Sequence, residues 1–400
     1  MGLSFLLKVS LIAAFVELAA ADPTFEPTPD GFIRSGSRKQ CQTSLRDCTK
    51  GTILVSKNHT RSDFTTIQSA IDSLPDDSSP QTILILAGDY TEQLNVTRAG
   101  PITLLGQTDH ITDASRNKVT VYWSAANHDS SYPDNVYTSV LTVAPTLDAS
   151  LTGVGPSGFP VPEDTPFGNV DFRVYNVDFR NVYSEYSDGP AHALSFSRSN
   201  GGFYYCGFYS YQDTIYIGKL GNAYFYRNII AGQTDFLYGF GTAWVESSQI
   251  LLRNCGGGIT AWKGTNTTFE NKYGIYIVSS TVKAANASIG RTITGKCALG
   301  RPWNSQHRSI FANTYEDESI IDTGYINWIV DGVGRLTNDT VMAEYRALGP
   351  GFNLTGRLEA GIGIVMNQNQ HRPYDRPEKV FQTPDGTFGN VGWIDWTSWE

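Results

Sequence analysis

Two aspartates occupy the same place in two consecutive copies of a short repeat. Phe203 recurs as Phe225, and Asp213 recurs as Asp235 (235 − 213 = 22). Other pairs at this spacing are Phe208 and Ile230, Ile215 and Leu237, and Tyr216 and Tyr238. Short apolar and aromatic runs that recur at about this period are typical of stacked coils, each of which buries its face against the next. Residues in register then lie about one strand spacing apart, roughly 4.8 Å.

Two carboxylates held this close do not both ionise readily. At an effective dielectric constant of about 20, two anions roughly 5 Å apart repel by about 3 kcal/mol, or more than two pKa units. One carboxyl can stay protonated, a fixed cation can neutralise the other, or both can happen. Such a pair is suited to the chemistry of a nucleophile with a general acid. The alternative is that each aspartate caps a turn between coils.

A candidate cation is Arg301, within the string Leu299–Trp303. A guanidinium can hold a carboxylate through two hydrogen bonds, lower its pKa and fix its orientation. If every coil held 22 residues, Arg301 would lie three coils beyond Asp235, roughly 14 Å away. We therefore expect longer coils in between, with the extra loop at Gly256–Gly258 and Thr265–Asn271.

Short β-branched or aromatic runs, separated by Gly, Asn, Asp and Ser, dominate the chain. They predict strands over Thr82–Ala87, Val170–Phe179, Leu194–Phe196, Phe203–Phe208, Tyr224–Ile230, Val245–Leu252, Ile275–Val278 and Ile310–Phe311. The apolar spacing from Asp63 to Ile71 predicts a short capping helix before them. No long amphipathic helices alternate with the strands, which disfavours a doubly wound α/β sheet. A sandwich is the competitor, but matching residues at a spacing of about 20 favour an all-β parallel β-helix.

The N-terminus has the features of a secretory signal. Lys8 precedes an apolar run from Val9 to Leu18, and Ala19–Ala21 form a small-residue cleavage site. We expect residues 1–21 to be removed and the mature chain to be secreted to the extracellular space, with no membrane span. An N-terminal segment over residues 22–60, a β-helix catalytic domain over 61–352 and a C-terminal tail over 353–400 are expected to follow.

Sequons and cysteines agree with the secretory route. The sequons are at Asn58, Asn95, Asn266, Asn286, Asn338 and Asn353, and they predict a glycoprotein. Of the 5 cysteines, Cys41 and Cys48 are close enough to bridge a local loop, and the odd count leaves one thiol unpaired. The tail contains Trp393, Trp396 and Trp399, which we interpret as packing residues, with a sugar-stacking platform as the alternative.

The charge excludes some partners. A formal net charge of −9 and a pI near 5.2 argue against nucleic acid, because a phosphate backbone attracts a basic surface. They argue weakly against a highly anionic polymer, whereas a polymer whose acids are masked as neutral esters is compatible. The chain has no Gly-x-Ser-x-Gly elbow, no His-Glu-x-x-His and no Cys-x-x-Cys, so serine hydrolase and zinc chemistry have no support.

Four ordered strings carry a family resemblance. Tyr211–Thr214, Gly232–Gly239 and Leu299–Trp303 resemble three signature motifs of pectin methylesterases, and Gly88–Glu92 resembles a fourth. The likeness runs from about Asp63 to Gly351 and is greatest to the fungal members.

The resemblance implies a single-stranded right-handed parallel β-helix that hydrolyses methyl esters of polygalacturonate, without metal or cofactor. The residue that matches the family's nucleophile is Asp235, and Asp213 matches the general acid and base. Gln212 matches a residue that holds the oxyanion, and Arg301 matches the residue that positions the nucleophile. Trp303, Tyr216 and Tyr238 match aromatic residues along the sugar groove, although a stacked aromatic ladder would explain the two tyrosines nearly as well. The implied partner is methyl-esterified homogalacturonan (pectin), and we expect a monomer.

The chain departs from the family pattern at one place. The family usually has a second glutamine about 22 residues before the one that matches Gln212, and here the string Gly189–Leu194 contains His192 instead. An imidazole can donate one hydrogen bond to an oxyanion, so we place His192 among the candidate substrate-binding residues. The alternative is a structural histidine whose hydrogen bonds are satisfied within the protein.

Two other functions remain open from the sequence. A pectate-type lyase would also use a β-helix, with an arginine base and acidic calcium ligands. A non-catalytic polysaccharide-binding β-helix would bind pectin without releasing methanol. The presence of both aspartates, Gln212 and Arg301 favours the esterase.

Overall fold

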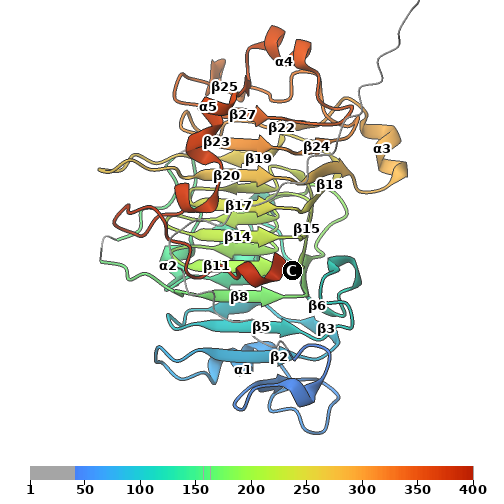
Figure 1. Ribbon diagram of the computed structural model, residues 1–400, viewed down its shortest axis with the longest axis vertical. Coiled ribbons are helices and arrows are strands. Elements are labelled where there is room, and N and C mark those ends of the chain that lie inside the picture. Colours follow the sequence, from blue (N-terminus) through green and yellow to red (C-terminus); the bar gives the residue numbers. More distant parts are fainter. Residues whose placement is uncertain (1–40, 156, 163, 400) are drawn as a thin grey trace, which may run out of the picture. The chain divides into compact units, whose positions relative to one another are not determined.

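The strands wind into a parallel β-helix (Figure 1). The computed structural model describes residues 41–155, 157–162 and 164–399. In this part of the chain, three parallel sheets called A, B and C contain 11, 8 and 7 strands. Each central coil adds one strand to each sheet, whereas the first and last coils add a strand to sheet A alone, and the strands of sheet A lie one above the next in Figure 1. Parallel strands joined in this way take right-handed connections, so the predicted right-handed parallel β-helix is confirmed.

The strand bounds follow the winding of the chain. Sheet A contains β1 (Ile53–Val55), β2 (Gln81–Ile85), β5 (Ile102–Gly106), β8 (Phe172–Tyr175), β11 (Asn200–Tyr204), β14 (Asn222–Tyr226), β17 (Thr242–Glu246), β20 (Gly274–Val278), β23 (Arg308–Ala312), β27 (Val341–Tyr345) and β28 (Ile364–Val365). Sheet B contains β3 (Gly88–Thr91), β6 (Val119–Trp123), β9 (Val177–Asn181), β12 (Gly207–Tyr209), β15 (Ile229–Thr234), β18 (Gln249–Gly256), β21 (Thr281–Ala284) and β24 (Tyr315–Glu316). Sheet C contains β4 (Leu94–Val96), β7 (Leu141–Val143), β10 (Leu194–Phe196), β13 (Ile215–Ile217), β16 (Leu237–Gly239), β19 (Gly258–Trp262) and β22 (Ala298–Gly300). A small antiparallel pair, β25 (Ile329–Val330) and β26 (Val333–Gly334), lies outside these sheets.

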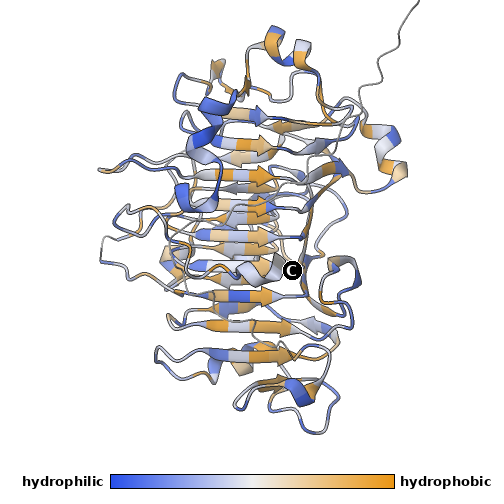
Figure 2. Ribbon diagram, viewed as in Figure 1, coloured by the Kyte–Doolittle hydropathy of each residue, from blue (hydrophilic) through white to orange (hydrophobic). Residues whose placement is uncertain are grey.

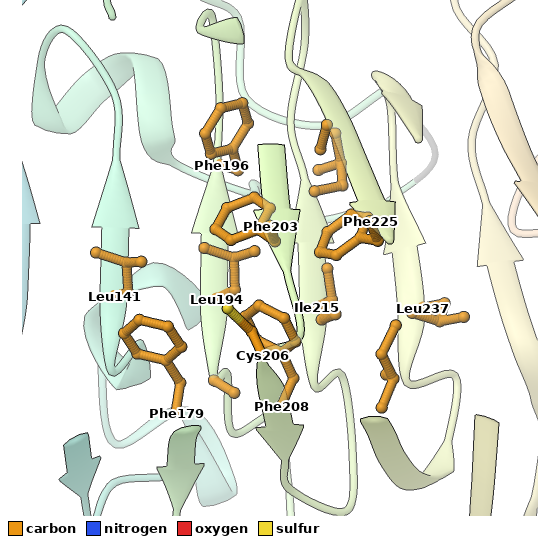
Figure 3. Close-up of a cluster of buried hydrophobic side chains, with 14 of the residues drawn as sticks. Leu141, Phe179, Leu194, Phe196, Phe203, Cys206, Phe208, Ile215, Phe225 and Leu237 are labelled. Carbon is orange, nitrogen blue, oxygen red and sulfur yellow. The ribbon is translucent and has the colours of Figure 1, made fainter. Parts of the chain in front are cut away.

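The sequence repeat is the register of the coils. Phe203 pairs with Phe225 between β11 and β14, and their rings stack with centroids 5.0 Å apart. Leu141, Leu194, Ile215 and Leu237 pair in turn across sheet C, and Figure 3 shows them side by side with the phenylalanine rings in the core. Such ladders bury apolar area that no coil could bury alone, and Figure 2 shows hydrophobic residues concentrated along the strands.

Four of the predicted strands are each two strands that meet at a corner. The run predicted over Val170–Phe179 is β8 followed by β9, with Asn176 at φ 53° between them. The corresponding corners of the next three coils are Tyr205, Arg227 and Ser247, also at positive φ. One residue in the left-handed region turns the chain from sheet A to sheet B. Because both flanking strands are buried, the apolar pattern continues through the corner and does not reveal it.

The predicted capping helix closes the first coils. It is α1 (Ile67–Asp72), whose residues Ile67, Ala70 and Ile71 are buried. The carboxylate of Glu92 accepts hydrogen bonds from the backbone nitrogens of Ile67 (3.0 Å) and Gln68 (2.9 Å), which are unpaired donors at the start of a helix. The string Gly88–Glu92 therefore anchors this helix.

Among the described residues, four further short α-helices lie between or beyond the strands. They are α2 (Leu147–Ser150), α3 (Ala287–Ile293), α4 (Leu354–Ala360) and α5 (Gln368–His371). After α5 the chain returns along sheet A, where Phe381 and Trp393 are buried against its outer tyrosines (Figure 1). Trp396 lies 5.9 Å from the ring of Tyr224. The packing interpretation is thus confirmed for Trp393 and Trp396.

Two disulfides join parts of the described chain. Cys41 bonds to Cys48, as the short spacing suggested, and Cys255 bonds to Cys297. Cys206 is a free, buried thiol.

The expected signal peptide, residues 1–21, lies outside the described residues, as do residues 22–40 of the N-terminal segment. Among the residues that the structure describes, no helix has the length and apolar composition needed to cross a membrane.

Candidate active site

The two repeated aspartates lie at the turn from sheet B to sheet C in neighbouring coils. Asp213 stands between β12 and β13, and Asp235 between β15 and β16. Their coils are in register, because Ile215 pairs with Leu237 and the nitrogen of Asp213 bonds to the Thr234 oxygen at 3.1 Å. Both aspartates have positive φ, 58° and 48°, a conformation that aspartate tolerates better than most residues. The tight turn and the chemistry thus favour the same residue type.

Arg301 holds Asp235 through two donors. Its Nη2 lies 2.6 Å from Oδ2, and its Nε lies 3.0 Å from Oδ1. The Gly258 nitrogen donates to the same Oδ1 at 3.0 Å. A carboxylate that receives a planar guanidinium and a backbone N–H has a fixed orientation.

The winding explains how Arg301 reaches so far back along the sequence. It follows β22, which lies only two strands beyond β16 in sheet C, instead of the three coils that equal spacing would give. The last of these coils is lengthened by the loop at 263–273, as expected, and by α3, which the sequence did not suggest. The disulfide between Cys255 and Cys297 ties the end of β18 to the start of β22.

Gly257 leaves room for this ion pair. Its φ is +61°, and a Cβ placed on it would lie 2.5 Å from Asp235 Oδ1 and 2.8 Å from Arg301 Cζ. Any other residue would be strained in the backbone and would also push the ion pair apart. The glycine run that we expected to be an extra loop is therefore part of the site.

The two carboxyls differ in how strongly they hold a proton. Burial raises the pKa of Asp235 above its ordinary value, while the hydrogen bonds and charge of Arg301 act in the opposite direction. Arg301 lowers this pKa, as expected, but desolvation outweighs the guanidinium, so the net shift of the pKa is upward. Burial, followed by the charge of Asp235, raises the pKa of Asp213 well above its usual range. Asp235, with the guanidinium beside it, therefore ionises more readily than Asp213.

Gln212 lies beside Asp213 and is held by a loop. Its Oε1 accepts a hydrogen bond from Ser187 Oγ at 2.8 Å. The backbone nitrogen of Ser187 also donates to Gln233 Oε1 at 3.2 Å. Because the amide oxygen of Gln212 is occupied, its NH₂ group is the end of this side chain that can donate to a bound molecule.

Tyr216, Tyr238 and His192 lie behind the carboxylates. Tyr216 and Tyr238 pair in register with ring centroids 4.9 Å apart, and they are 2% and 4% exposed. His192 is 0% exposed, and its two ring nitrogens bond to Tyr238 and Ser195. The structure therefore places the tyrosines in a buried ladder and His192 in a satisfied hydrogen-bond network, and none of the three presents an exposed face to a sugar.

Trp303 lies at the surface of the site among further aromatic and cationic groups. It is half-buried, its Nε1 donates to the Gly155 oxygen at 3.1 Å, and its ring is 4.5 Å from that of Trp328. The Arg301 guanidinium lies 3.6 Å from the centre of the Trp328 ring, so this tryptophan contacts the cation through its ring face. The Lys263 ammonium lies 4.4 Å from the centre of the Trp303 ring, and burial lowers its pKa to about 8.

Sequence reasoning missed Gly257, Lys263 and Trp328. The glycine run was the only signal for the first. Lys263 and Trp328 belong to no repeat, and only the winding brings them to the aspartates.

Comparison with known proteins agrees with this geometry. A model of the pectinesterase family matches residues 168–380. The chain is 32% identical over 308 residues to a probable pectinesterase A of Neosartorya fischeri, covering 76% of this chain and 82% of that protein. It is 30% identical to a probable pectinesterase A of Aspergillus niger, covering 76% and 81%. The crystal structure of the pectin methylesterase from Aspergillus niger has the same fold, with a TM-score of 0.65 at 24% identity over 88% of this chain and 97% of that one. The chain therefore belongs to the pectinesterase family of enzymes.

Proposed function

We propose that this chain hydrolyses methyl esters of polygalacturonate to pectate and methanol through an aspartyl acyl-enzyme. The observation that carries the proposal is the bidentate bond from Arg301 to Asp235 beside a buried Asp213, whose pKa burial and the charge of Asp235 raise well above its ordinary value. One carboxyl is then a fixed anion and its neighbour is an acid, which is the division of roles that ester hydrolysis requires.

The first half-reaction forms the acyl-enzyme. The Asp235 carboxylate attacks the ester carbonyl carbon, and the negative charge that develops on the carbonyl oxygen receives a hydrogen bond from the Gln212 NH₂ group. As the tetrahedral intermediate collapses, the carbon–oxygen bond to the methoxy group breaks. Asp213 gives its proton to that oxygen, and methanol leaves.

The second half-reaction returns the enzyme to its starting state. Asp213, now ionised, takes a proton from water while the water oxygen attacks the acyl carbon. The bond to Asp235 breaks, so Asp235 is again an anion and the galacturonic acid unit is released, which gives its proton to the solvent and becomes the carboxylate of pectate. Arg301 holds Asp235 in position throughout. It also stabilises the negative charge of the Asp235 carboxylate when that carboxylate leaves the acyl carbon. No step uses a metal or a cofactor.

Aromatic residues next to the proposed catalytic residues are suited to contact the substrate. We propose that Trp303, which is half-buried against Trp328, the tryptophan on which Arg301 stacks, contacts the sugar chain of methyl-esterified homogalacturonan. Tyr216 and Tyr238 support this surface from below.

We also propose that the mature chain is a secreted, monomeric glycoprotein. Five of its sequon asparagines are exposed: Asn58, Asn95, Asn266, Asn286 and Asn338. Mass measurement of the secreted protein before and after deglycosylation tests this.

Methanol release from methylated pectin tests the proposed function, with and without a chelator, for the wild type and Asp235→Ala. We expect the wild type to release methanol regardless of the chelator and Asp235→Ala to lose at least a thousandfold in rate while it keeps its melting temperature. A product with an ultraviolet-absorbing unsaturated end, lost with chelator, would instead identify a lyase. Pectin binding without methanol release would identify a binding protein, and near-normal activity of Asp235→Ala would refute the assignment.

A further inference from the structure

A buried chain of polar side chains lies behind Asp213. The pairing of Leu194 with Ile215 in sheet C places His192 one coil before Asp213, as Asp213 lies one coil before Asp235. His192 is therefore the member of the same column in the preceding coil, turned into the protein instead of toward the solvent. Tyr238, on β16, reaches this column from the coil of Asp235.

The contacts in this chain are short and buried. Tyr238 Oη lies 2.6 Å from His192 Nε2, and His192 Nδ1 lies 2.8 Å from Ser195 Oγ. Ser139 Oγ lies 2.7 Å from Ser195 Oγ and 3.3 Å from His192 Nδ1. The four side chains belong to residues that are at most 4% exposed. A network this well satisfied holds each member in one orientation.

The network ends at the catalytic acid. The Tyr238 hydroxyl also lies close enough to the Asp213 carboxyl to lower its pKa, and the Asn135 side chain lowers the pKa of the Tyr238 hydroxyl in the same way. Tyr238 thus lies between His192 and Asp213. A hydroxyl has only one hydrogen. Whether His192 donates a hydrogen bond to the Tyr238 oxygen or accepts one from it therefore determines whether that hydrogen can point to Asp213.

The histidine is a neutral ring. Burial lowers the pKa of His192 to about 3, with the charge of Asp134 opposing. A neutral imidazole has one N–H and one acceptor nitrogen. When Ser195 donates to Nδ1, the proton is on Nε2 and is donated to the Tyr238 oxygen. The Tyr238 hydrogen is then free for Asp213.

We propose that His192 and Tyr238 are positioning residues for the general acid: His192 donates to the Tyr238 oxygen, and Tyr238 donates to the Asp213 carboxyl and fixes its orientation toward the leaving group. This inference rests on the proposed function. It gives His192 a role other than direct contact with the oxyanion, which its burial prevents.

The hydrogen bond favours the ionised form of Asp213, which is the base of the second half-reaction. The other charged groups that face Asp213 are Asp235, which raises its pKa, and Lys263 and Arg301, which lower it. Asp134 faces both His192 and Tyr238. A substitution that leaves these four groups in place and removes only the Tyr238 hydroxyl isolates the contribution of the network.

Tyr238→Phe makes that change. We expect kcat to fall about tenfold, the effect of one charge-assisted hydrogen bond, with KM within about twofold. Loss of the donor raises the pKa of Asp213, and activity requires this acid to be protonated. The alkaline limb of the pH profile should therefore move to higher pH.

The matched control is Tyr276→Phe. Tyr276, on β20 of sheet A, is a buried tyrosine whose hydroxyl donates to the Lys272 oxygen (2.6 Å). It should lose stability without moving the pH profile.

A double-mutant cycle tests the role of His192. If His192 acts through Tyr238, His192→Val should lower kcat as much as Tyr238→Phe does, and the double variant should be no slower than either. His192→Gln, whose amide can donate to Tyr238, should recover most of the activity.

An unchanged kcat and an unchanged alkaline limb in Tyr238→Phe would overturn the inference, as would a double variant in which the two losses multiply. Should the His192 variants not fold, the comparison of Tyr238→Phe with Tyr276→Phe still decides. Failure of the proposed function is a different result, since the wild type would then release no methanol.

Discussion

At the scale of single residues, the site depends on an ion pair that a glycine makes room for. The position of Gly257 requires both a left-handed backbone and the absence of a side chain, and only glycine meets both requirements. The first requirement, a positive φ, is also found at many other turns of the described chain. The second requirement is specific to the site, because the atoms that a side chain would strike belong to Asp235 and Arg301.

Gly257→Ala should therefore lose activity beyond its loss of stability. We expect kcat to fall at least a hundredfold, because a methyl group 2.5 Å from Asp235 Oδ1 must displace the carboxylate or the guanidinium. The measurement is methanol release alongside thermal unfolding. Gly295→Ala is the matched control: its φ is +63°, and an added Cβ would meet nothing within 4 Å. Both variants should unfold more easily, by about 1–2 kcal/mol, but only Gly257→Ala should be inactive. Equal activities would show that the site tolerates the methyl group.

At the scale of elements, the site is assembled from the ends of strands in four coils. Gln212 and Asp213 follow β12, Asp235 follows β15, Gly258 begins β19, and Arg301 follows β22. Three of these strand ends are adjacent by the regular winding. Arg301 is delivered by the coil that the 263–273 loop and α3 lengthen, so its strand is the one least constrained by the repeat.

The disulfide between Cys255 and Cys297 constrains that strand. Its removal by the paired change to serine should lower stability by about 4 kcal/mol on the chain-entropy model for a separation of 42 residues. It should also lower kcat, because Cys297 directly precedes β22. Pairing serines at Cys41 and Cys48 is the control: a separation of 7 residues gives a smaller loss, about 2–3 kcal/mol, and no loss of kcat. Melting temperatures and methanol release distinguish the two, and an equal kcat in both variants would show that the disulfide does not position Arg301.

At the scale of the whole molecule, the last coils are joined by a buried charged cluster. Arg357, on α4, donates to Glu344 at 2.7 Å and to Glu316 at 2.9 Å, and all three side chains are at most 2% exposed. One guanidinium balances one carboxylate. Burial, followed by the charge of Glu344, raises the pKa of Glu316 to about 9, so this glutamate is protonated in the folded protein at neutral pH.

Glu316 should make the protein less stable as the pH rises. The unfolded chain releases this proton near its ordinary pKa of 4.5, whereas the folded protein holds it to about 9. The folded state thus binds more protons between these values, and the free energy of unfolding falls there by up to about 1.4 kcal/mol per pH unit. Glu316→Gln should remove this dependence, which melting temperatures from pH 5 to 8 would show. Glu318→Gln, at an exposed glutamate two residues further along the chain, should keep it. The same slope in both variants would contradict the assignment.

The sequence determined the features that depend on regular spacing. A period of 22 residues set the register of two coils, and with it the neighbouring positions of Asp213 and Asp235, the Tyr216–Tyr238 ladder and the core column from Phe203 to Phe225. These features follow because stacked coils repeat the same local contacts. The motif strings around Gln212 and Arg301 added the family, which the comparisons confirmed.

Only the tertiary structure decided how unequal coils combine. It showed the corners that split four predicted strands, the two-coil path from Asp235 to Arg301, and the support that Trp328 gives to the guanidinium. It also showed which side chains are buried. Burial raises the pKa of Asp235 although Arg301 acts to lower it, and it places His192 behind the site. Burial and the path of the loops depend on contacts among residues that are distant in sequence. The local sequence pattern therefore cannot predict them.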